Sequence, residues 1–171
     1  MRSPRTRVRV LPRIALALYL LWLASITLSP APGVMEGTSP AGIRVNLVPF
    51  DSIRGLIALG PNWPAVRLLA GNVVVFVPFG LLAPAAWPRL RSFGLTALAG
   101  FGLSLGIECV QLSLSLRLGH TYRVSEVDDV LLNVTGVVLG WAAMRCGQCV
   151  RPVVASPPSG CCPRPEPRAP G

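Results

Sequence analysis

Carboxylate and amide side chains interrupt the longest apolar stretches of this chain at helical spacing. Glu108 and Gln111 lie three residues apart in one stretch, and serines on either side extend the same helical face. A later stretch repeats this spacing with Asp129, Asn133, Gly136 and Gly140. A carboxylate on such a face can carry a proton or bind a cationic group, and a carboxylate cluster can hold Mg²⁺ beside a lipid phosphate.

Other polar groups fall at comparable depths. At 1.5 Å per residue, Glu108 lies about 12 Å inside its apolar stretch, and Asn72 and Asn133 lie about 9 Å inside theirs. We therefore predict that these groups converge on one ligand-binding pocket. Its candidate residues are Asn46, Asn72, Glu108, Gln111, Arg123, Asp128, Asp129 and Asn133.

Two alternatives to a binding pocket stay open. The polar groups could only join helices, through hydrogen bonds worth well under about 2 kcal/mol each. They could also catalyse a reaction on a lipid or lipid-linked substrate through Glu108, Asp128 and Asp129. The sequence contains no HExxH, GxSxG or P-loop motif, and its single histidine, His120, falls in a connecting segment. We assign no catalytic residue and expect a protein that is not an enzyme, with no cofactor and no metal.

Composition points to a membrane protein. The 171 residues are 51% hydrophobic and 13% charged, with sixteen basic residues against seven acidic ones. So few charges exclude disorder and an ordinary soluble enzyme. A soluble nucleic-acid-binding protein would cluster its basic residues, whereas here the arginines punctuate apolar runs.

Four apolar stretches, at about residues 14–28, 68–87, 93–116 and 127–144, predict the elements that carry these groups. A bilayer core of about 30 Å requires about 20 helical residues. We expect an all-α integral membrane protein with four transmembrane helices in a bundle over residues 14–144. The short first stretch could also be a cleaved signal peptide, but cleavage after Ala31 would leave Pro32 first, and a retained anchor is favoured.

Arginine placement predicts the orientation. With the basic segment 1–13 in the cytoplasm, eleven arginines lie inside and five outside, which fits the positive-inside rule. We predict a multi-pass protein of the cell membrane with both termini cytoplasmic and the polar pocket facing outward. Residues 43–59 then lie outside, between the first two spans, as an interfacial or re-entrant segment or as an ordinary loop.

The chain ends in a Pro- and Cys-rich tail, residues 145–171, that we expect to be a disordered cytoplasmic segment. Its cysteines are Cys146, Cys149, Cys161 and Cys162. Zinc binding, membrane-proximal acylation and inert thiols are all compatible with their spacing.

Backbone-shaping residues recur beside the polar ones. Pro78 removes a helical hydrogen bond and frees a carbonyl near Val74, which neighbouring helices must satisfy. Gly136 and Gly140 form a small-xxx-small pair that lets another helix approach closely.

In chain order, the motifs resemble the VanZ-like membrane family. They are Asn46-Leu47-Val48-Pro49-Phe50, the stretch 71–80 (GNVVVFVPFG), Glu108 with Gln111, Arg123, and the stretch 128–136 (DDVLLNVTG) followed by Gly140. The resemblance covers about residues 14–144. A proline-rich tail and the residues His120 and Tyr122 depart from it.

The resemblance implies a four-helix membrane protein and a role in low-level teicoplanin resistance, since the family's namesake accompanies glycopeptide-resistance clusters. We assign structural roles to Pro49, Phe50, Pro78, Gly80, Gly136 and Gly140. The expected partners are the lipid bilayer and a lipid-linked cell-wall component or lipoglycopeptide, not nucleic acid. Oligomerisation is left open.

Overall fold

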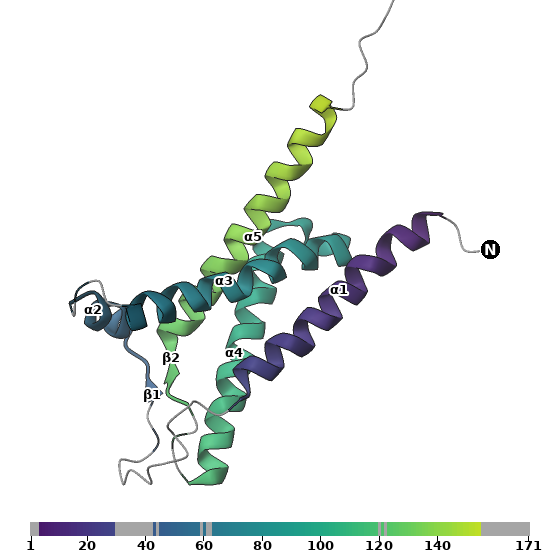
Figure 1. Ribbon diagram of the computed structural model, residues 1–171. Coiled ribbons are helices and arrows are strands. Elements are labelled where there is room, and N and C mark those ends of the chain that lie inside the picture. The colour runs from purple at the N-terminus through teal and green to yellow at the C-terminus, as the bar shows by residue number, and fades with distance from the viewer. Residues whose placement is uncertain are drawn as a thin grey trace, which may run out of the picture.

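The computed structural model describes residues 4–29, 43, 45–58, 60, 63–119, 121 and 123–154. Over these residues the chain is almost entirely helical (Figure 1). The elements in order are α1 (Pro4–Thr27), β1 (Val45–Asn46), α2 (Asp51–Ala58), α3 (Trp63–Ala86), the 3₁₀ helix η2 (Pro88–Arg91), α4 (Phe93–Leu118), β2 (Ser125–Glu126) and α5 (Val127–Val154). The expectation of an all-α fold is confirmed.

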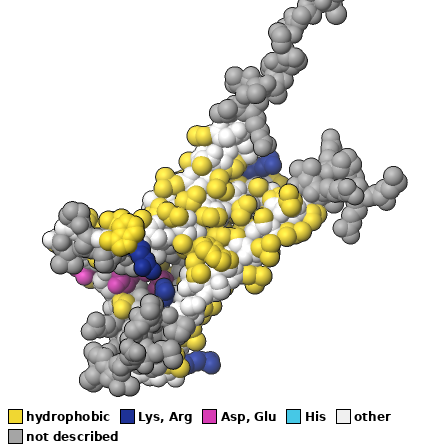
Figure 2. All heavy atoms as spheres, viewed as in Figure 1, with side chains coloured by type: hydrophobic (Ala, Val, Ile, Leu, Met, Phe, Trp, Pro, Cys, Tyr) yellow, Lys and Arg dark blue, Asp and Glu magenta, His cyan; other side chains and the backbone are white. Residues whose placement is uncertain are grey.

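Within the described residues, four helices are long and apolar enough to cross a membrane. Their apolar windows are Val10–Thr27, Leu69–Ala86, Phe93–Leu118 and Val127–Gln148. Large apolar side chains stay exposed on them, as at Leu98, which is 64% exposed. Figure 2 shows hydrophobic side chains spread over the helical body, with acidic side chains gathered near α2. Lipid tails, not water, suit such a surface.

The helices extend beyond the apolar stretches that predicted them. α1 begins at Pro4, within the basic segment, and α3 begins at Trp63. α5 continues to Val154, into the segment expected to be disordered. Between Met144 and Pro152 the sequence has no proline, and α5 runs through Pro152 to end two residues later at Val154. Residues 155–171, with Cys161 and Cys162, lie outside the described residues.

The helices α3 and α5 form the central pair, because glycines let their backbones touch. A Cβ at Gly136 or Gly140 would overlap the carbonyl oxygen of Val73 or Val77, and one at Gly80 would overlap the Val137 carbonyl. α1 packs mainly on α3, and α4 packs mainly on α5 (Figure 1). A core of buried apolar side chains, including Leu16, Leu23, Phe76, Phe79 and Val137, joins these helices.

A tyrosine from α1 bonds to the backbone of α3 close to the proline inside that helix. Pro78 has no N–H, so the carbonyl four residues earlier in α3, that of Val74, lacks its usual helical donor. The Tyr19 hydroxyl, in a buried side chain, donates to the carbonyl oxygen of Val75 at 2.9 Å. The bond ties α1 to α3 beside the carbonyl of Val74, and the expectation that a neighbouring helix satisfies the Val74 carbonyl itself stays a prediction.

The motif at residues 46–50 folds into a compact turn beside the start of α5. β1 and β2 pair in parallel, with Val45 opposite Ser125 and Asn46 opposite Glu126. Pro49 precedes Phe50, which has a positive φ of 65°, as the third residue of a turn closed by the Asp51 N–H donating to the Val48 carbonyl at 3.4 Å.

The turn is fastened to α5 by one carboxylate. Asp128, only 2% exposed, accepts the backbone N–H of Phe50 at 2.5 Å and that of Ile53 at 3.1 Å. These bonds satisfy two N–H groups at the start of α2 and hold Phe50 in its strained conformation. The short helix α2 therefore lies at the same end of the bundle as the strands (Figure 1).

Candidate functional site

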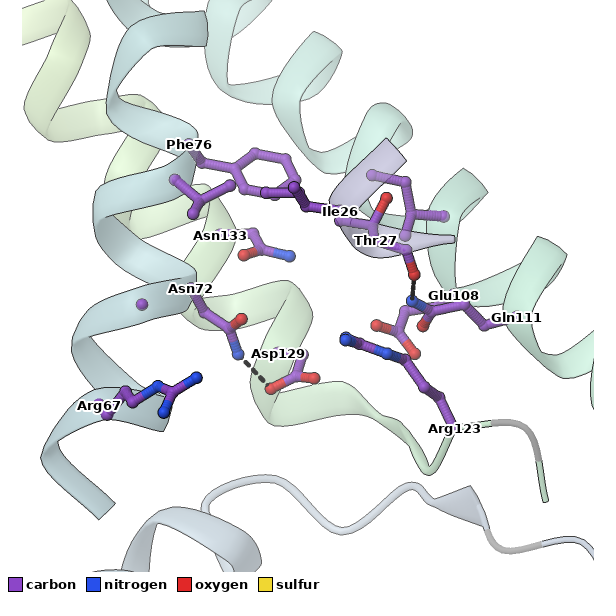
Figure 3. A pocket seen from close by; sticks show the side chains of 13 residues that line it. Ile26, Thr27, Arg67, Asn72, Phe76, Glu108, Gln111, Arg123, Asp129 and Asn133 are labelled. Carbon is purple, nitrogen blue, oxygen red and sulfur yellow. Dashed lines mark hydrogen bonds between the residues drawn. The ribbon is translucent and has the colours of Figure 1, made fainter. Parts of the chain in front are cut away.

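A cavity of about 510 Å³ opens between the ends of the four long helices near α2. We call it the polar pocket. It is lined by Ile26, Thr27, Arg67, Gly71, Asn72, Val75, Phe76, Ile107, Glu108, Gln111, Arg123, Asp129 and Asn133 (Figure 3). Each long helix supplies a wall, and the segment before β2 supplies Arg123.

Hydrogen bonds across the polar pocket join its walls in pairs. Asn72 Nδ2 on α3 donates to Asp129 Oδ1 on α5 at 2.5 Å. Gln111 Nε2 on α4 donates to the Thr27 carbonyl oxygen of α1 at 2.8 Å. These amides therefore act as interhelical ties as well as lining.

The inner wall carries an amide that is only half satisfied. Asn133 is 7% exposed, and its Nδ2 donates to Ser104 Oγ at 2.9 Å. Its Oδ1 is buried and has no hydrogen-bond partner among the described residues. A buried acceptor without a partner costs about 1–3 kcal/mol, so a donor placed beside this oxygen would be stabilising.

Two charged side chains leave atoms unpaired in the same pocket. Glu108 Oε2 and Arg123 Nε are buried and have no hydrogen-bond partner within the described part of the chain. In Figure 3, Glu108 and Arg123 extend toward the centre of the pocket, with Asp129 facing them from α5. The pocket therefore offers two carboxylates, two arginines and an amide oxygen, which together suit a head group that carries both donors and acceptors.

Six of the eight predicted pocket residues line the cavity, namely Asn72, Glu108, Gln111, Arg123, Asp129 and Asn133. Asn46 and Asp128 do not. Asn46 Nδ2 donates to Asp51 Oδ2 and Ser52 Oγ, at 3.3 and 3.1 Å, and its Oδ1 accepts the Val48 N–H. Consecutive residues of a helix point about 100° apart, so Asp128 faces α2 while Asp129 faces the pocket.

Sequence reasoning missed the pocket's contributions from α1 and from the start of α3. Arg67 lies five residues before Asn72, which is about 140° around an α-helix, so helical spacing from Asn72 gave no signal for it. Thr27 takes part through its backbone carbonyl, which side-chain patterns do not reveal.

Metal and thiol chemistry would depend on the His, Cys, Asp and Glu side chains of the described residues. No group of three or more His, Cys, Asp or Glu side chains that could hold a metal occurs among those residues. Cys109 and Cys146 are exposed free thiols. The side chain of Cys149, together with His120 and Tyr122, lies outside what the structure describes.

Comparison with known proteins gives one match. The family model VanZ/LLP1 matches residues 16–148, from the first turns of the α1 span almost to the end of α5. The match includes every residue that lines the polar pocket. No curated protein and no solved structure matches the chain.

Proposed function

The chain belongs to the VanZ/LLP1 family, and on that premise we propose that its polar pocket binds the head group of an amphiphilic cell-envelope molecule. In this proposal the protein lies in the plasma membrane with both termini in the cytoplasm and the pocket facing outward. Through this binding it contributes to low-level teicoplanin resistance or to envelope homeostasis. The ligand is a lipid-linked cell-wall component or the acyl-bearing part of a lipoglycopeptide.

The unpartnered oxygen of Asn133 is the observation that carries the proposal. Asn133 lines the cavity of about 510 Å³, and hydrogen bonds between helices leave its buried Oδ1 without a donor among the described residues. Together with Glu108 Oε2 it suits an ammonium or hydroxyl donor, while Arg123 suits a phosphate or carboxylate. A head group that carries both a positive and a negative charge can therefore bind Asn133, Glu108 and Arg123 together.

The location of the polar pocket supports an amphiphile rather than a freely soluble ligand. The exposed surface of the spanning helices is apolar, as Leu98 and Leu139 illustrate, and the pocket lies at one end of those helices. A molecule anchored in the bilayer can reach it while keeping its tail in hydrocarbon.

A membrane enzyme is the second candidate, because Glu108 and Asp129 share one cavity. Asp128, the third carboxylate of that hypothesis, is occupied by two backbone N–H groups. Turnover of a lipid by the purified protein, dependent on a divalent cation, is the result that would favour this candidate.

Glycopeptide susceptibility tests the binding proposal. We expect wild-type protein to raise the teicoplanin concentration that a sensitive host tolerates, and Glu108→Gln and Asp129→Asn to abolish that protection at matched membrane levels. Both variants keep the size of the side chain and remove its charge. Asp51→Asn is the matched control, because Asp51 is an exposed carboxylate outside the polar pocket.

Three results would count against binding in the pocket: no protection from the wild type, full protection from both pocket variants, or equal loss in Asp51→Asn. Vancomycin, tested in parallel, reports whether the effect extends to glycopeptides generally. If Glu108→Gln and Asp129→Asn instead lower the amount of this protein in the membrane, the two side chains serve to hold the helices together.

A further inference from the structure

A second cavity, of about 430 Å³, lies between α1 and α4, and we call it the apolar groove. It is lined chiefly by apolar groups, including Leu20, Leu23, Leu103, Gly106, Ile107 and Val110. The helices α1 and α4 pack against α3 and α5 rather than against each other, which leaves this gap.

The apolar groove adjoins the polar pocket. Thr27 and Ile107 line both cavities, so these two residues form the boundary between them. The bond from Gln111 Nε2 to the Thr27 carbonyl stands beside this junction and holds the two helices at a fixed separation.

Two glycines keep the groove wide along α4. A Cβ built at Gly102 or Gly106 would meet no atom within 4 Å, so no side chain from α1 fills the space above them. Along α1 the groove extends from Leu20 to Leu28, or about 12 Å at the helical rise. That is most of the hydrocarbon of one leaflet, about 15 Å.

We propose that the apolar groove holds an alkyl chain of the amphiphile whose head group occupies the polar pocket. This inference rests on the proposed function and adds the tail to it. The occupant is an amphiphile with an amine and an anionic group in its head, as in an aminophospholipid. The ammonium contacts Glu108 and Asn133, the anionic group contacts Arg123, and the chain passes Thr27 and Ile107 into the groove.

The groove provides specificity rather than a large binding energy. Moving an alkyl chain from lipid into an apolar groove removes little water-exposed area, so the hydrophobic effect adds little. The charged groups of the head supply the attraction, and the groove selects molecules whose tail leaves the head in the direction of α1 and α4. Ligands therefore arrive sideways from the leaflet.

Photo-crosslinking in nanodiscs tests this arrangement. The probe is phosphatidylethanolamine with a diazirine in one acyl chain, added at rising mole fraction to phosphatidylcholine. We expect labelling at Leu103 and Val110 to saturate at a low mole fraction. Labelling at Leu98, which faces outward from α4, rises in proportion to the probe.

Filling the groove separates specific binding from ordinary lipid contact. Gly106→Leu, and Gly102→Leu as a second variant, are expected to raise the mole fraction for half-saturation about tenfold. Gly94→Leu is the matched control, since a Cβ at Gly94 also meets no atom within 4 Å but Gly94 lies outside the groove. Elution of each variant as a monodisperse species confirms its fold before labelling.

A second probe, with the diazirine in the head group, separates failure of this inference from failure of the proposed function. If head labelling near Glu108 saturates but chain labelling at Leu103 stays proportional, the groove assignment is overturned and the pocket stands. Unchanged saturation in both groove variants overturns it as well. If neither probe saturates in the wild type, the inference about the groove and its aminophospholipid occupant is overturned, while the proposed function is decided separately by the teicoplanin susceptibility of the pocket variants.

Discussion

Two pairs of glycines, each spaced by four residues, lie in opposite surroundings. Gly136 and Gly140 on α5 press against the backbone of α3, where carbonyl oxygens occupy the place of a side chain. Gly102 and Gly106 on α4 face open space beside α1. The spacing is the same in the two helices, but one pair closes a helix seam and the other keeps a gap open.

The comparison separates two uses of a small residue in a membrane protein. At the α3–α5 seam, glycine gains van der Waals contact between backbones, which drives helix association in lipid. At the α1–α4 gap, a Cβ in place of the glycine hydrogen would meet no protein atom within 4 Å, although glycine within a helix costs about 0.5–1 kcal/mol relative to alanine. A residue that is costly and unpacked suits a space reserved for something other than protein.

The largest expected effect comes from breaking the seam. In Gly140→Ala the new methyl overlaps the Val77 carbonyl, and backbone atoms on both helices must move apart. Overpacking of this kind destabilises by about 1–3 kcal/mol. Unfolding of purified protein in mixed micelles measures the loss. An unchanged unfolding midpoint would mean that the seam is looser than the structure has it.

A smaller effect is expected from removing the hydrogen bond that joins α4 to α1. Gln111→Leu removes the donor to the Thr27 carbonyl and should cost about 0.5–1.5 kcal/mol. Faster hydrogen exchange confined to the last turn of α1 is the expected observation. Gln148→Leu is the control, because Gln148 is exposed near the far end of α5 and bonds only locally, to Met144. Equal exchange in both variants would argue against the tie.

The smallest effect, of opposite sign, is expected at the gap itself. Gly106→Ala introduces a methyl into open space and improves helix propensity, so the free energy of unfolding should stay the same or rise by up to about 1 kcal/mol. The same micelle titration used for Gly140→Ala measures it. Destabilisation comparable to that of Gly140→Ala would show that α1 packs more tightly on α4 than described.

The transmembrane helices were predictable because the hydrocarbon core of a bilayer requires each spanning helix to have about 20 mostly apolar residues. All four apolar stretches became helices that could cross a membrane, and the polar faces of α4 and α5 turned inward, with Ser104, Gln111 and Asn133 buried. Helix ends were less predictable. Outside the apolar stretch, continuation depends on capping and tertiary contacts, as in α5, which runs on to Val154.

The charged residues of the site could be predicted from the sequence, but the different roles of the adjacent residues Asp128 and Asp129 could not. Depth and helical face placed Asn72, Glu108 and Asp129 together. Spacing grouped Asp129 with Asn133 on one face, but nothing in the sequence indicates that the neighbouring Asp128 binds the turn before α2, because that depends on how α5 is rotated about its axis. The apolar groove could not be predicted either. It exists because α1 and α4 pack on other helices and not on each other, and the hydropathy of a sequence does not show which helices pack together.

The two adjacent aspartates make it possible to sort other members of the family from their sequences. Asp128 fastens the Pro49-Phe50 turn to α5, whereas Asp129 belongs to the polar pocket. A relative that keeps the first acid and has lost the second would retain this architecture with a pocket of different charge, and so a different ligand. A relative with the reverse pattern would need another way to hold its turn. Shared family membership therefore need not mean a shared ligand, and position 129 is where the divergence would first be visible.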